Sequence, residues 1–259
     1  MAMTKISAMI TVFNEDKSIG KCLNSIKGIV DEIVVVHCGP CKDKTVEIAK
    51  KYTSHIFIDK DYGVACPNRP FGFSKCTGDW VLQLDADESL SQELQQQLRK
   101  LAKQESIDAY AFRWSDVNDI MILGKKLKKY KPVFFRKSKL LNEGIVHEPT
   151  RTSGAMITSE LVLNHEPLAT NFDPAVYAKK VHRWVLIDAQ SRVERGLAPG
   201  SRWFYLVKAP VWFIAYLLYY YLWLKYILGG RMGLQMGFFH AQYNFNLYYQ
   251  IFKMKKNYT

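Results

Sequence analysis

Two aspartates separated by one residue and followed by a glutamate form the segment Asp85-Ala86-Asp87-Glu88. Carboxylate oxygens at this spacing suit Mg²⁺ or Mn²⁺, with phosphate oxygens and water filling the remaining positions around the ion. A cation held there would neutralise a diphosphate as it leaves a substrate. The same short pattern is common in surface loops, so its meaning depends on the element that carries it.

An apolar run, Trp80-Val-Leu-Gln-Leu84, leads directly into these carboxylates. A run of this length is typical of a buried strand. In open α/β sheets, ligands bind beyond the carboxyl ends of the strands, which is where Asp85 and Asp87 would stand. The position therefore favours a metal site over a solvated loop.

Strand and helix patterns alternate along the first half of the chain. Apolar, β-branched runs predict strands over residues 6–12, 33–36, 55–58 and 80–84. Helices are predicted through 23–26 and over 43–51, 71–76 and 91–104, with Asp43 available as an N-cap. The alternation predicts an α/β fold with a mostly parallel sheet. Residues 110–136 have no clean period and indicate strands and loops, whereas 173–195 has helical spacing.

Charge and composition change abruptly at Pro199-Gly200. The chain has 259 residues, 48% of them hydrophobic, and a net charge of +12. From Arg195 to the end there are eight basic residues and no acidic one, so this segment carries +8 of the charge. The first seven residues lack the features of a secretory signal, and five cysteines lie in the first third. We expect free thiols and a location on the cytosolic side.

Two of these cysteines form Cys38-Gly-Pro-Cys41 between a predicted strand and a predicted helix. The same tetrapeptide is the redox motif of thioredoxin-like proteins, in which a helix N-terminus lowers a thiol pKa. This chain has no Trp ahead of the motif, and its strand order and length fit that fold poorly. We therefore favour the replacement of an ordinary loop over a redox role.

The motifs in their order resemble those of family 2 glycosyltransferases with the GT-A fold. The resemblance rests on Val12-Phe-Asn-Glu15, Val34-Val-Val36, Thr77-Gly-Asp-Trp80 and Leu84-Asp-Ala-Asp-Glu88. Later segments, Val146-His-Glu148, the stretch around His165 and the aromatic tail, resemble the bacterial branch that adds glucose or a related sugar to the lipopolysaccharide inner core. The likeness spans nearly the whole chain.

The resemblance implies an inverting transfer from a nucleotide-sugar, with UDP-sugar expected from the family likeness. The implied donor-site residues are Thr11, Phe13, Asn14, Glu15, His37, Arg69, Asp85, Ala86 and Asp87. Thr11 and Phe13 could equally be packing residues at the end of a strand. Relatives usually carry Asp-Ser-Gly-Ser-Thr-Asp where this chain has His37-Cys-Gly-Pro-Cys-Lys-Asp43, and Asn where Pro70 stands. These departures leave the base and the donor class open.

An inverting transfer needs a carboxylate that takes the proton of the acceptor hydroxyl. Glu148 is our choice, because it matches a family motif in the half of the chain expected to hold acceptor. The other candidates are Glu143, Asp116 and Asp119, and a structural role for Glu148 is a further alternative. His165, or else His147, is expected to join Asp85 and Asp87 at the metal, although a lone His is more often structural.

Sixteen uncharged residues, Ala209–Leu224, lie between Lys208 and Lys225 and are rich in Tyr and Trp. The run is short for a membrane span, and these aromatics favour the headgroup boundary. A helix starting near Pro210, a stop at Gly229-Gly230 and a second helix over 232–256 would lie in the interface of an anionic membrane. Alternatively, the aromatics cover the catalytic domain or form a dimer contact.

We therefore predict a GT-A domain over 1–198 and a membrane-associated helical tail over 199–259. The predicted partners are a nucleotide-sugar, an anionic membrane at the cytoplasmic face of the inner membrane, and a membrane-associated glycan or glycolipid acceptor such as lipopolysaccharide core. Another lipid-linked or polypeptide acceptor is the first alternative. The second is a non-catalytic membrane-binding protein with a degenerate fold; the tail is too apolar to favour nucleic acid.

Overall fold

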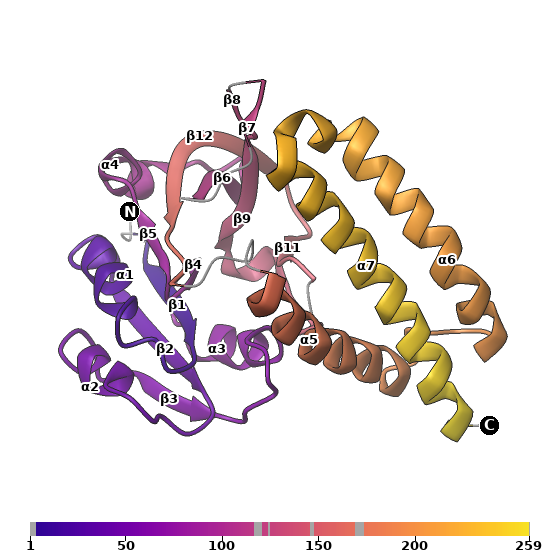
Figure 1. The fold of residues 1–259 in the computed structure, drawn as a ribbon. Helices are drawn as coiled ribbons and strands as arrows, with labels where there is room; N and C mark the ends of the chain where they lie inside the picture. Colours follow the sequence, from indigo (N-terminus) through magenta and orange to yellow (C-terminus); the bar gives the residue numbers. More distant parts are fainter. Residues whose placement is uncertain (1–3, 117–120, 124, 146–147, 169–173, 259) are drawn as a thin grey trace. The chain divides into compact units, whose positions relative to one another are not determined.

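The computed structural model describes residues 4–116, 121–123, 125–145, 148–168 and 174–258, which fall into two compact units. The first unit comprises residues 1–117 and 128–168, and the second comprises 118–127 and 169–259 (Figure 1). The second unit includes the helix over 174–194, which the sequence analysis assigned to the catalytic domain. The functional division between residues 198 and 199 stays a prediction.

An eight-stranded sheet forms the centre of the first unit, in the order β3-β2-β1-β4-β9-β6-β12-β5. Its strands are β1 (Ile6–Val12), β2 (Glu32–Cys38), β3 (Ile56–Asp59), β4 (Trp80–Asp85), β5 (Glu88–Leu90), β6 (Ala109–Asp116), β9 (Lys129–Arg136) and β12 (Met156–His165). Two-stranded pairs are formed by β7 (Met121–Ile122) with β8 (Lys125–Lys126), and by β10 (Leu140–Leu141) with β11 (Arg151–Thr152).

The sheet is mostly parallel, as predicted. Strands β3, β2, β1 and β4 pair in parallel, which confirms the alternation seen in the sequence. Strand β9 is antiparallel to both β4 and β6, and β5 is antiparallel to β12. The remaining pair, β6 with β12, is parallel, so only β9 and β5 run against the others.

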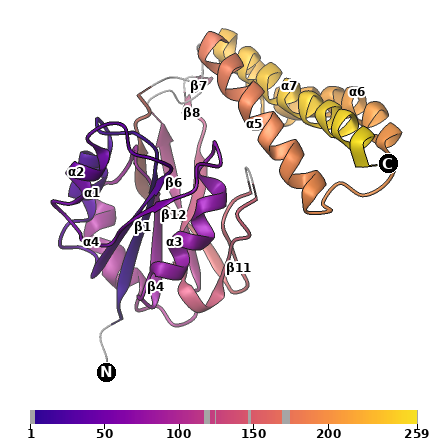
Figure 2. The same cartoon turned by 90° about the horizontal axis from the view of Figure 1, so that it is seen from below.

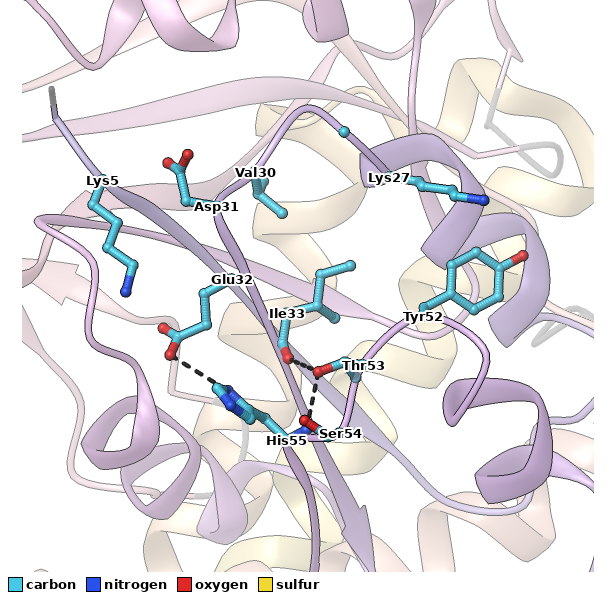
Figure 3. A pocket seen from close by; sticks show the side chains of 11 residues that line it. Lys5, Lys27, Val30, Asp31, Glu32, Ile33, Tyr52, Thr53, Ser54 and His55 are labelled. Atoms are coloured by element: carbon cyan, nitrogen blue, oxygen red, sulfur yellow. Dashed lines mark hydrogen bonds and ion pairs between the residues drawn. The ribbon is translucent and has the colours of Figure 1, made fainter.

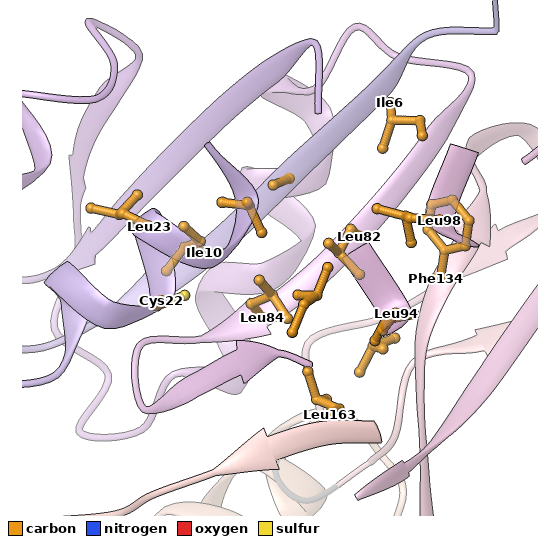
Figure 4. Close-up of a cluster of buried hydrophobic side chains, with 14 of the residues drawn as sticks. Ile6, Ile10, Cys22, Leu23, Leu82, Leu84, Leu94, Leu98, Phe134 and Leu163 are labelled. Atoms are coloured by element: carbon orange, nitrogen blue, oxygen red, sulfur yellow. The ribbon is translucent and has the colours of Figure 1, made fainter. Parts of the chain in front are cut away.

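Helices cover both faces of the sheet in the first unit (Figure 2). On one face, α1 (Ile19–Ile26) and α4 (Gln92–Leu101) pack Leu23, Leu94 and Leu98 against Ile10, Leu82 and other buried residues of β1 and β4 (Figure 4). On the other face, Phe73 of α3 (Arg69–Lys75) packs in a second cluster with Met9 and Val36. Successive strand residues point to opposite faces, which explains why the central strands are apolar on both sides.

The helix α2 (Thr45–Ala49) is shorter than the predicted 43–51. Asp43 lies one position ahead of the N-cap Lys44, but its Oδ1 still accepts the Thr45 N–H at 2.9 Å. The helix α4 begins after Ser91, whose hydroxyl accepts the N–H of Leu94 as an N-cap. Capping chemistry therefore marks both starts, although the exact ends differ from the predicted ones.

Apart from the β7–β8 pair, the described part of the second unit is helical. It contains α5 (Pro174–Glu194), α6 (Arg202–Leu218), a π-helical turn (Tyr219–Trp223), a short 3₁₀ turn (Tyr226–Gly229) and α7 (Gly230–Met254). A buried cluster of Ala189, Tyr205, Leu247 and Ile251 joins the three long helices. The two tail helices and the break at Gly229-Gly230 agree with the sequence, and α5 matches the helix predicted over 173–195.

The predicted helix start at Pro210 was wrong. Pro210 lies inside α6, which begins after Ser201, whose hydroxyl accepts the Trp203 N–H at 3.3 Å. Proline lacks the N–H that would bond the carbonyl four residues earlier, so it interrupts the helix without ending it here. By length and composition alone, Arg202–Trp223 is apolar enough to cross a membrane, and only 6% of its most apolar window is buried.

Candidate active site

The acidic motif lies where the sequence placed it, at the carboxyl end of β4 and beside the end of β1. Strand pairing sets Asp85 opposite Thr11. The Thr11 hydroxyl donates to Asp85 Oδ1 at 3.3 Å. Thr11 therefore contacts the acidic motif, and its role in donor binding stays a prediction.

Two cations hold the carboxylate of Asp85. Arg69 Nη2 lies 3.1 Å from Asp85 Oδ1, and Lys131 Nζ lies 2.7 Å from Asp85 Oδ2. Burial alone would raise the pKa of Asp85, but Lys131 and Arg69 outweigh it and hold that pKa well below its usual value. Asp85 is consequently ionised and fixed in position at any physiological pH.

Lys131 also reaches Glu88, which is almost completely buried. Its Nζ lies 2.6 Å from Glu88 Oε1, which also accepts the indole N–H of Trp114 at 2.7 Å. The Asp85 N–H donates to Glu88 Oε2 at 3.0 Å. Burial raises the pKa of Glu88. Lys131 and Trp114 contact the acidic motif but were not predicted as site residues. Lys131 is one of three basic residues in β9, so its sequence context did not single it out.

Asp87 lies beside His165 and not beside the two cations that hold Asp85. Because β5 pairs with β12 so that Glu88 faces His165, the imidazole Nε2 lies 3.3 Å from Asp87 Oδ2. The His165 ring also stacks on Trp114, with centroids 4.2 Å apart. A cavity of about 110 Å³ adjoins Asp87 and is lined by Ala86, Ser18 and Lys21 among others. The structure thus brings together the predicted ligands Asp87 and His165 beside an open space.

The loop after β1 lies next to the end of β2. Asn14 has a left-handed backbone (φ +51°), a conformation that Asn tolerates better than most residues. Its N–H donates to His37 Nε2 at 3.2 Å, and its Oδ1 accepts the Lys42 N–H at 2.8 Å. The exposed ring of Phe13 lies 5.9 Å from the His37 ring. Four predicted donor residues, 13 to 15 and 37, therefore form one connected loop system.

The carboxyl group of Glu15 has a raised pKa. Burial raises its pKa to about 7, and the nearby charges of Asp87 and Asp85 add to this effect. Its N–H donates to Thr45 Oγ1 at 2.7 Å, which fixes the loop against the start of α2. A neutral Glu15 beside two aspartates can donate a hydrogen bond, and an approaching cation would favour its ionisation.

Glu148 lies in the described part of the chain, with Oε1 at 2.5 Å from Arg151 Nη2. Its Oε2 is buried and has no hydrogen-bond partner. Among the described residues, no hydrogen bond or ion pair joins Glu148 to Asp85 or Asp87. Of the alternatives, Glu143 is exposed, and Asp119, His147 and the side chain of Asp116 lie outside what the structure describes.

The donor set tests whether a divalent cation fits. Asp87 and His165 offer an oxygen and a nitrogen at 3.3 Å, and Asp85 and Glu15 add carboxyl groups close enough to affect one another's charge. Oxygen-rich ligand sets with one imidazole suit Mn²⁺ or Mg²⁺. Asp85 is already balanced by Lys131 and Arg69, so Asp87 and His165 are the more available ligands.

A larger cavity of about 450 Å³ lies at the opposite end of the strands (Figure 3). Lys5 before β1 and Glu32 at the start of β2 line it, with Thr53 and His55 before β3. Glu32 accepts hydrogen bonds from Ser7 and from the backbone and hydroxyl of Thr77. Thr77 of the segment Thr77-Gly-Asp-Trp80 thus joins neighbouring strands at their amino ends, away from the acidic motif.

Comparison with known proteins identifies a match to the family described as glycosyl transferase family 2 over residues 7–160. An uncharacterised glycosyltransferase of Rickettsia typhi is 39% identical over 108 residues, which are 42% of this chain and 36% of that protein. The lipopolysaccharide core biosynthesis glycosyltransferase LpsC of Rhizobium meliloti is 24% identical over 225 residues, 79% of this chain and 77% of that one. The chain thus spans about a third of the length of the first of these relatives.

Solved structures show a more distant likeness. The TarS fragment 1-349 of S. aureus, in complex with UDP-GlcNAc, has a TM-score of 0.49 and 14% identity, with 98% of this chain and 92% of that chain covered. Glucosyl-3-phosphoglycerate synthase of M. tuberculosis has a TM-score of 0.49 and 16% identity, with 76% and 82% covered.

Proposed function

Because this chain belongs to glycosyl transferase family 2, we propose that it transfers a sugar, with inversion, from a nucleotide-sugar to a membrane-associated glycan or glycolipid. The observation that carries the proposal is the 3.3 Å contact between Asp87 and His165, which lies where β4 ends at Asp85 and β12 ends at His165. The family match covers all of β4 and the first half of β12, and it supports the GT-A architecture predicted from the motifs.

The donor is proposed to be a UDP-sugar. The chain differs from its relatives in the loop that starts at His37, where they usually carry Asp-Ser-Gly-Ser-Thr-Asp. Support comes from the connected loop of Phe13, Asn14 and His37, in which an exposed aromatic ring is available to a base. Asp87 and His165 would hold Mg²⁺ or Mn²⁺, which supplies positive charge to the departing diphosphate. Arg69 and Lys131 keep Asp85 ionised and oriented beside it.

Glu148 is proposed as the base that accepts the proton of the acceptor hydroxyl. Its buried and unpartnered Oε2 supports this role, because a carboxylate oxygen held without a donor is available to one that arrives with substrate. Arg151 holds the other oxygen and orients the group.

We propose that the acceptor is lipid-linked, with lipopolysaccharide core as the leading example. Support comes from the likeness to LpsC over 79% of the chain and from the exposed aromatic and apolar residues of α6. The second unit would hold the protein at the cytoplasmic face of the inner membrane as a peripheral protein. A polypeptide acceptor would need no such tail.

The test is calorimetric binding of a panel of nucleoside diphosphates and their sugars to the full chain, with Mn²⁺ and with a chelator. We expect one nucleotide to bind only with Mn²⁺, Asp87→Asn to lose that binding, and the exposed-site control Asp61→Asn to keep it. Glu148→Gln should bind the same nucleotide normally but turn over about 10²-fold to 10⁴-fold more slowly, as expected for loss of a general base.

Two results would contradict the proposal. Nucleotide binding that is unchanged in Asp87→Asn would remove the metal role of this aspartate. The absence of binding for every nucleotide, with or without Mn²⁺, would favour the non-catalytic alternative. Turnover that depends on detergent or lipid would support a lipid-linked acceptor over a polypeptide.

A further inference from the structure

A second set of metal-ligating side chains lies at the carboxyl end of β2, in the loop that replaces the usual family sequence. One ligand atom from each of His37, Cys41 and Asp43 lies within 4.8 Å of the others. His37 is fully buried, and Cys41 and Asp43 are half-buried, so the group has a closed side and an open side. We propose that these three side chains bind a borderline-soft divalent metal ion, with Zn²⁺ as the best match.

The hydrogen bonds of His37 set its ring in a state that can bind a metal. Nδ1 lies 2.6 Å from the Gly39 carbonyl oxygen, so Nδ1 carries the proton and donates it. Metal-binding histidines commonly donate their second ring N–H to a backbone carbonyl in this way. The lone pair on Nε2 then accepts the N–H of Asn14, at 3.2 Å, and a metal ion would take the place of that hydrogen.

The Cys41 thiol already points at Asp43. Its Sγ lies 3.3 Å from the Asp43 carbonyl oxygen and 3.5 Å from Asp43 Oδ1. The Asp43 carboxylate is held in turn by the N–H groups of Thr45, at 2.9 Å, and Asp16, at 3.1 Å. When a metal ion binds, the thiol proton leaves to solvent and the thiolate takes the coordination position.

The ligand types select the metal. Nitrogen, sulfur and a single carboxylate suit Zn²⁺, whereas Mg²⁺ and Ca²⁺ take oxygen ligands. Tetrahedral zinc would set these ligand atoms about 3.5 Å apart. Because they lie within 4.8 Å of one another, the widest pair would need to close by about 1.3 Å at most. Three protein ligands would leave the fourth position open to water or another small ligand.

The site differs in kind from the Asp87 and His165 pair. The thiol nearest to Asp87 belongs to Cys22, which is buried and is not a member of this cluster. A metal–thiolate signal that disappears in Cys41→Ser therefore reports on this cluster. The inference does not rest on the proposed function, because it requires neither nucleotide nor sugar transfer. Metal binding would also give the segment His37-Cys-Gly-Pro-Cys-Lys-Asp43 a role that differs from both redox chemistry and base reading.

The experiment is a titration of the full, reduced chain with Co²⁺, without nucleotide, followed by displacement with Zn²⁺. We expect a thiolate-to-cobalt charge-transfer band that saturates at one equivalent and disappears when zinc is added. Cys41→Ser should lose the band and bind zinc at least about tenfold more weakly, since even loss of a supporting group costs a site that much. The matched control is Cys66→Ser, which changes a half-buried cysteine outside the cluster and should keep the band.

Alkylation read by mass spectrometry gives a second measurement on the unmodified chain. Zinc should protect Cys41 from iodoacetamide and leave Cys66 reactive. The absence of a thiolate band, the same band in Cys41→Ser, or equal alkylation of Cys41 with and without zinc would each overturn the proposal. Asp87→Asn separates the two ideas, because it should lose metal-dependent nucleotide binding and keep the cobalt–thiolate band.

Discussion

Asp85 and Asp87 are one residue apart, yet their surroundings divide their roles. Asp85 is held by Arg69 and Lys131 and is charge-balanced within the protein. Asp87 faces His165 and an adjoining cavity. Under the proposed function, a cation that arrives with a diphosphate would therefore find its ligand at Asp87, and Asp85 would supply a fixed anchor.

At the residue scale, Lys131→Met should strongly destabilise the first unit. Lys131 is the cation shared by Asp85 and the buried Glu88, so its loss leaves buried carboxyl groups without their partner. Breaking a buried pair in this way costs about 3–5 kcal/mol of unfolding free energy. Urea unfolding of the full chain measures the change.

The matched control is Lys128→Met, which breaks the exposed ion pair with Glu160. An exposed pair contributes less than about 1 kcal/mol, so this variant should unfold close to wild type. Equal losses of unfolding free energy in the two variants would show that Lys131 contributes no more to stability than an exposed ion pair does. Addition of Mn²⁺ should not restore the stability of Lys131→Met, because the ligands proposed for the ion are Asp87 and His165.

Glu15 predicts a pH dependence. Its pKa is raised by burial from 4.5 to about 7, so the folded state binds a proton more tightly than the unfolded state does. The contribution of Glu15 to the free energy of unfolding is fully present below about pH 4.5 and is lost as the pH rises to about 7. The loss between these two pH values is about 3 kcal/mol. We expect the free energy of unfolding, measured with urea, to be lower at pH 7 than at pH 5 in the wild type. The difference between the two pH values should be smaller in Glu15→Gln. A parallel fall in both proteins would assign the pH dependence to other groups.

At the element scale, α6 illustrates how a local rule is overridden. Pro210 was expected to start the helix, but the Ser201 cap starts it nine residues earlier and Tyr205 anchors it in the buried cluster. Tyr205 also donates its hydroxyl proton to the Pro199 carbonyl at 2.8 Å. Tertiary packing and a good cap thus outweigh the cost of an interior proline.

Pro210→Ala should therefore make α6 more stable, by up to about 3 kcal/mol, because the helix regains one hydrogen bond and loses a ring clash. Hydrogen exchange of the α6 amides measures the local opening free energy, and exchange should slow. Pro199→Ala lies outside the helix and should change the exchange little. Faster exchange in Pro210→Ala would show that the proline is needed for the shape of α6.

At the scale of the whole molecule, the second unit exposes an apolar stripe along α6. Its members follow helical spacing and are Trp203, Val207, Val211, Ile214 and Leu218. The cations Arg202, Lys208 and Lys225 lie along the same segment. A stripe of this kind next to positive charge is what an anionic membrane surface binds.

We expect the double variant Val207→Glu with Ile214→Glu to lose most binding to anionic vesicles in a sedimentation assay. The substitutions replace two exposed apolar side chains, which would enter the membrane interface, by charges of the same sign as the lipid. The control Ile58→Glu changes an exposed apolar residue of the first unit and should bind vesicles normally. Wild-type binding that is equal for neutral and anionic vesicles would contradict the electrostatic part of the prediction.

Much of the fold could be predicted because it depends on local periodicity. The four parallel strands, the acidic motif at the end of β4 and the two tail helices all follow from apolar runs and breaks that lie close together in sequence. The same holds for the loop residues Phe13, Asn14 and Glu15, which follow β1 directly. Helix ends were less predictable, because caps such as Ser91 and Ser201 compete with nearby alternatives.

The sequence by itself determined the elements, the acidic motif and the likeness that identifies the family. Only the tertiary structure decided which distant side chains meet there. His165 reaches Asp87 because β12 pairs with β5, and Lys131 reaches Asp85 and Glu88 because β9 inserts between β4 and β6. Such pairings join residues more than 40 positions apart, and they are set by the burial of the whole sheet, which no local pattern records.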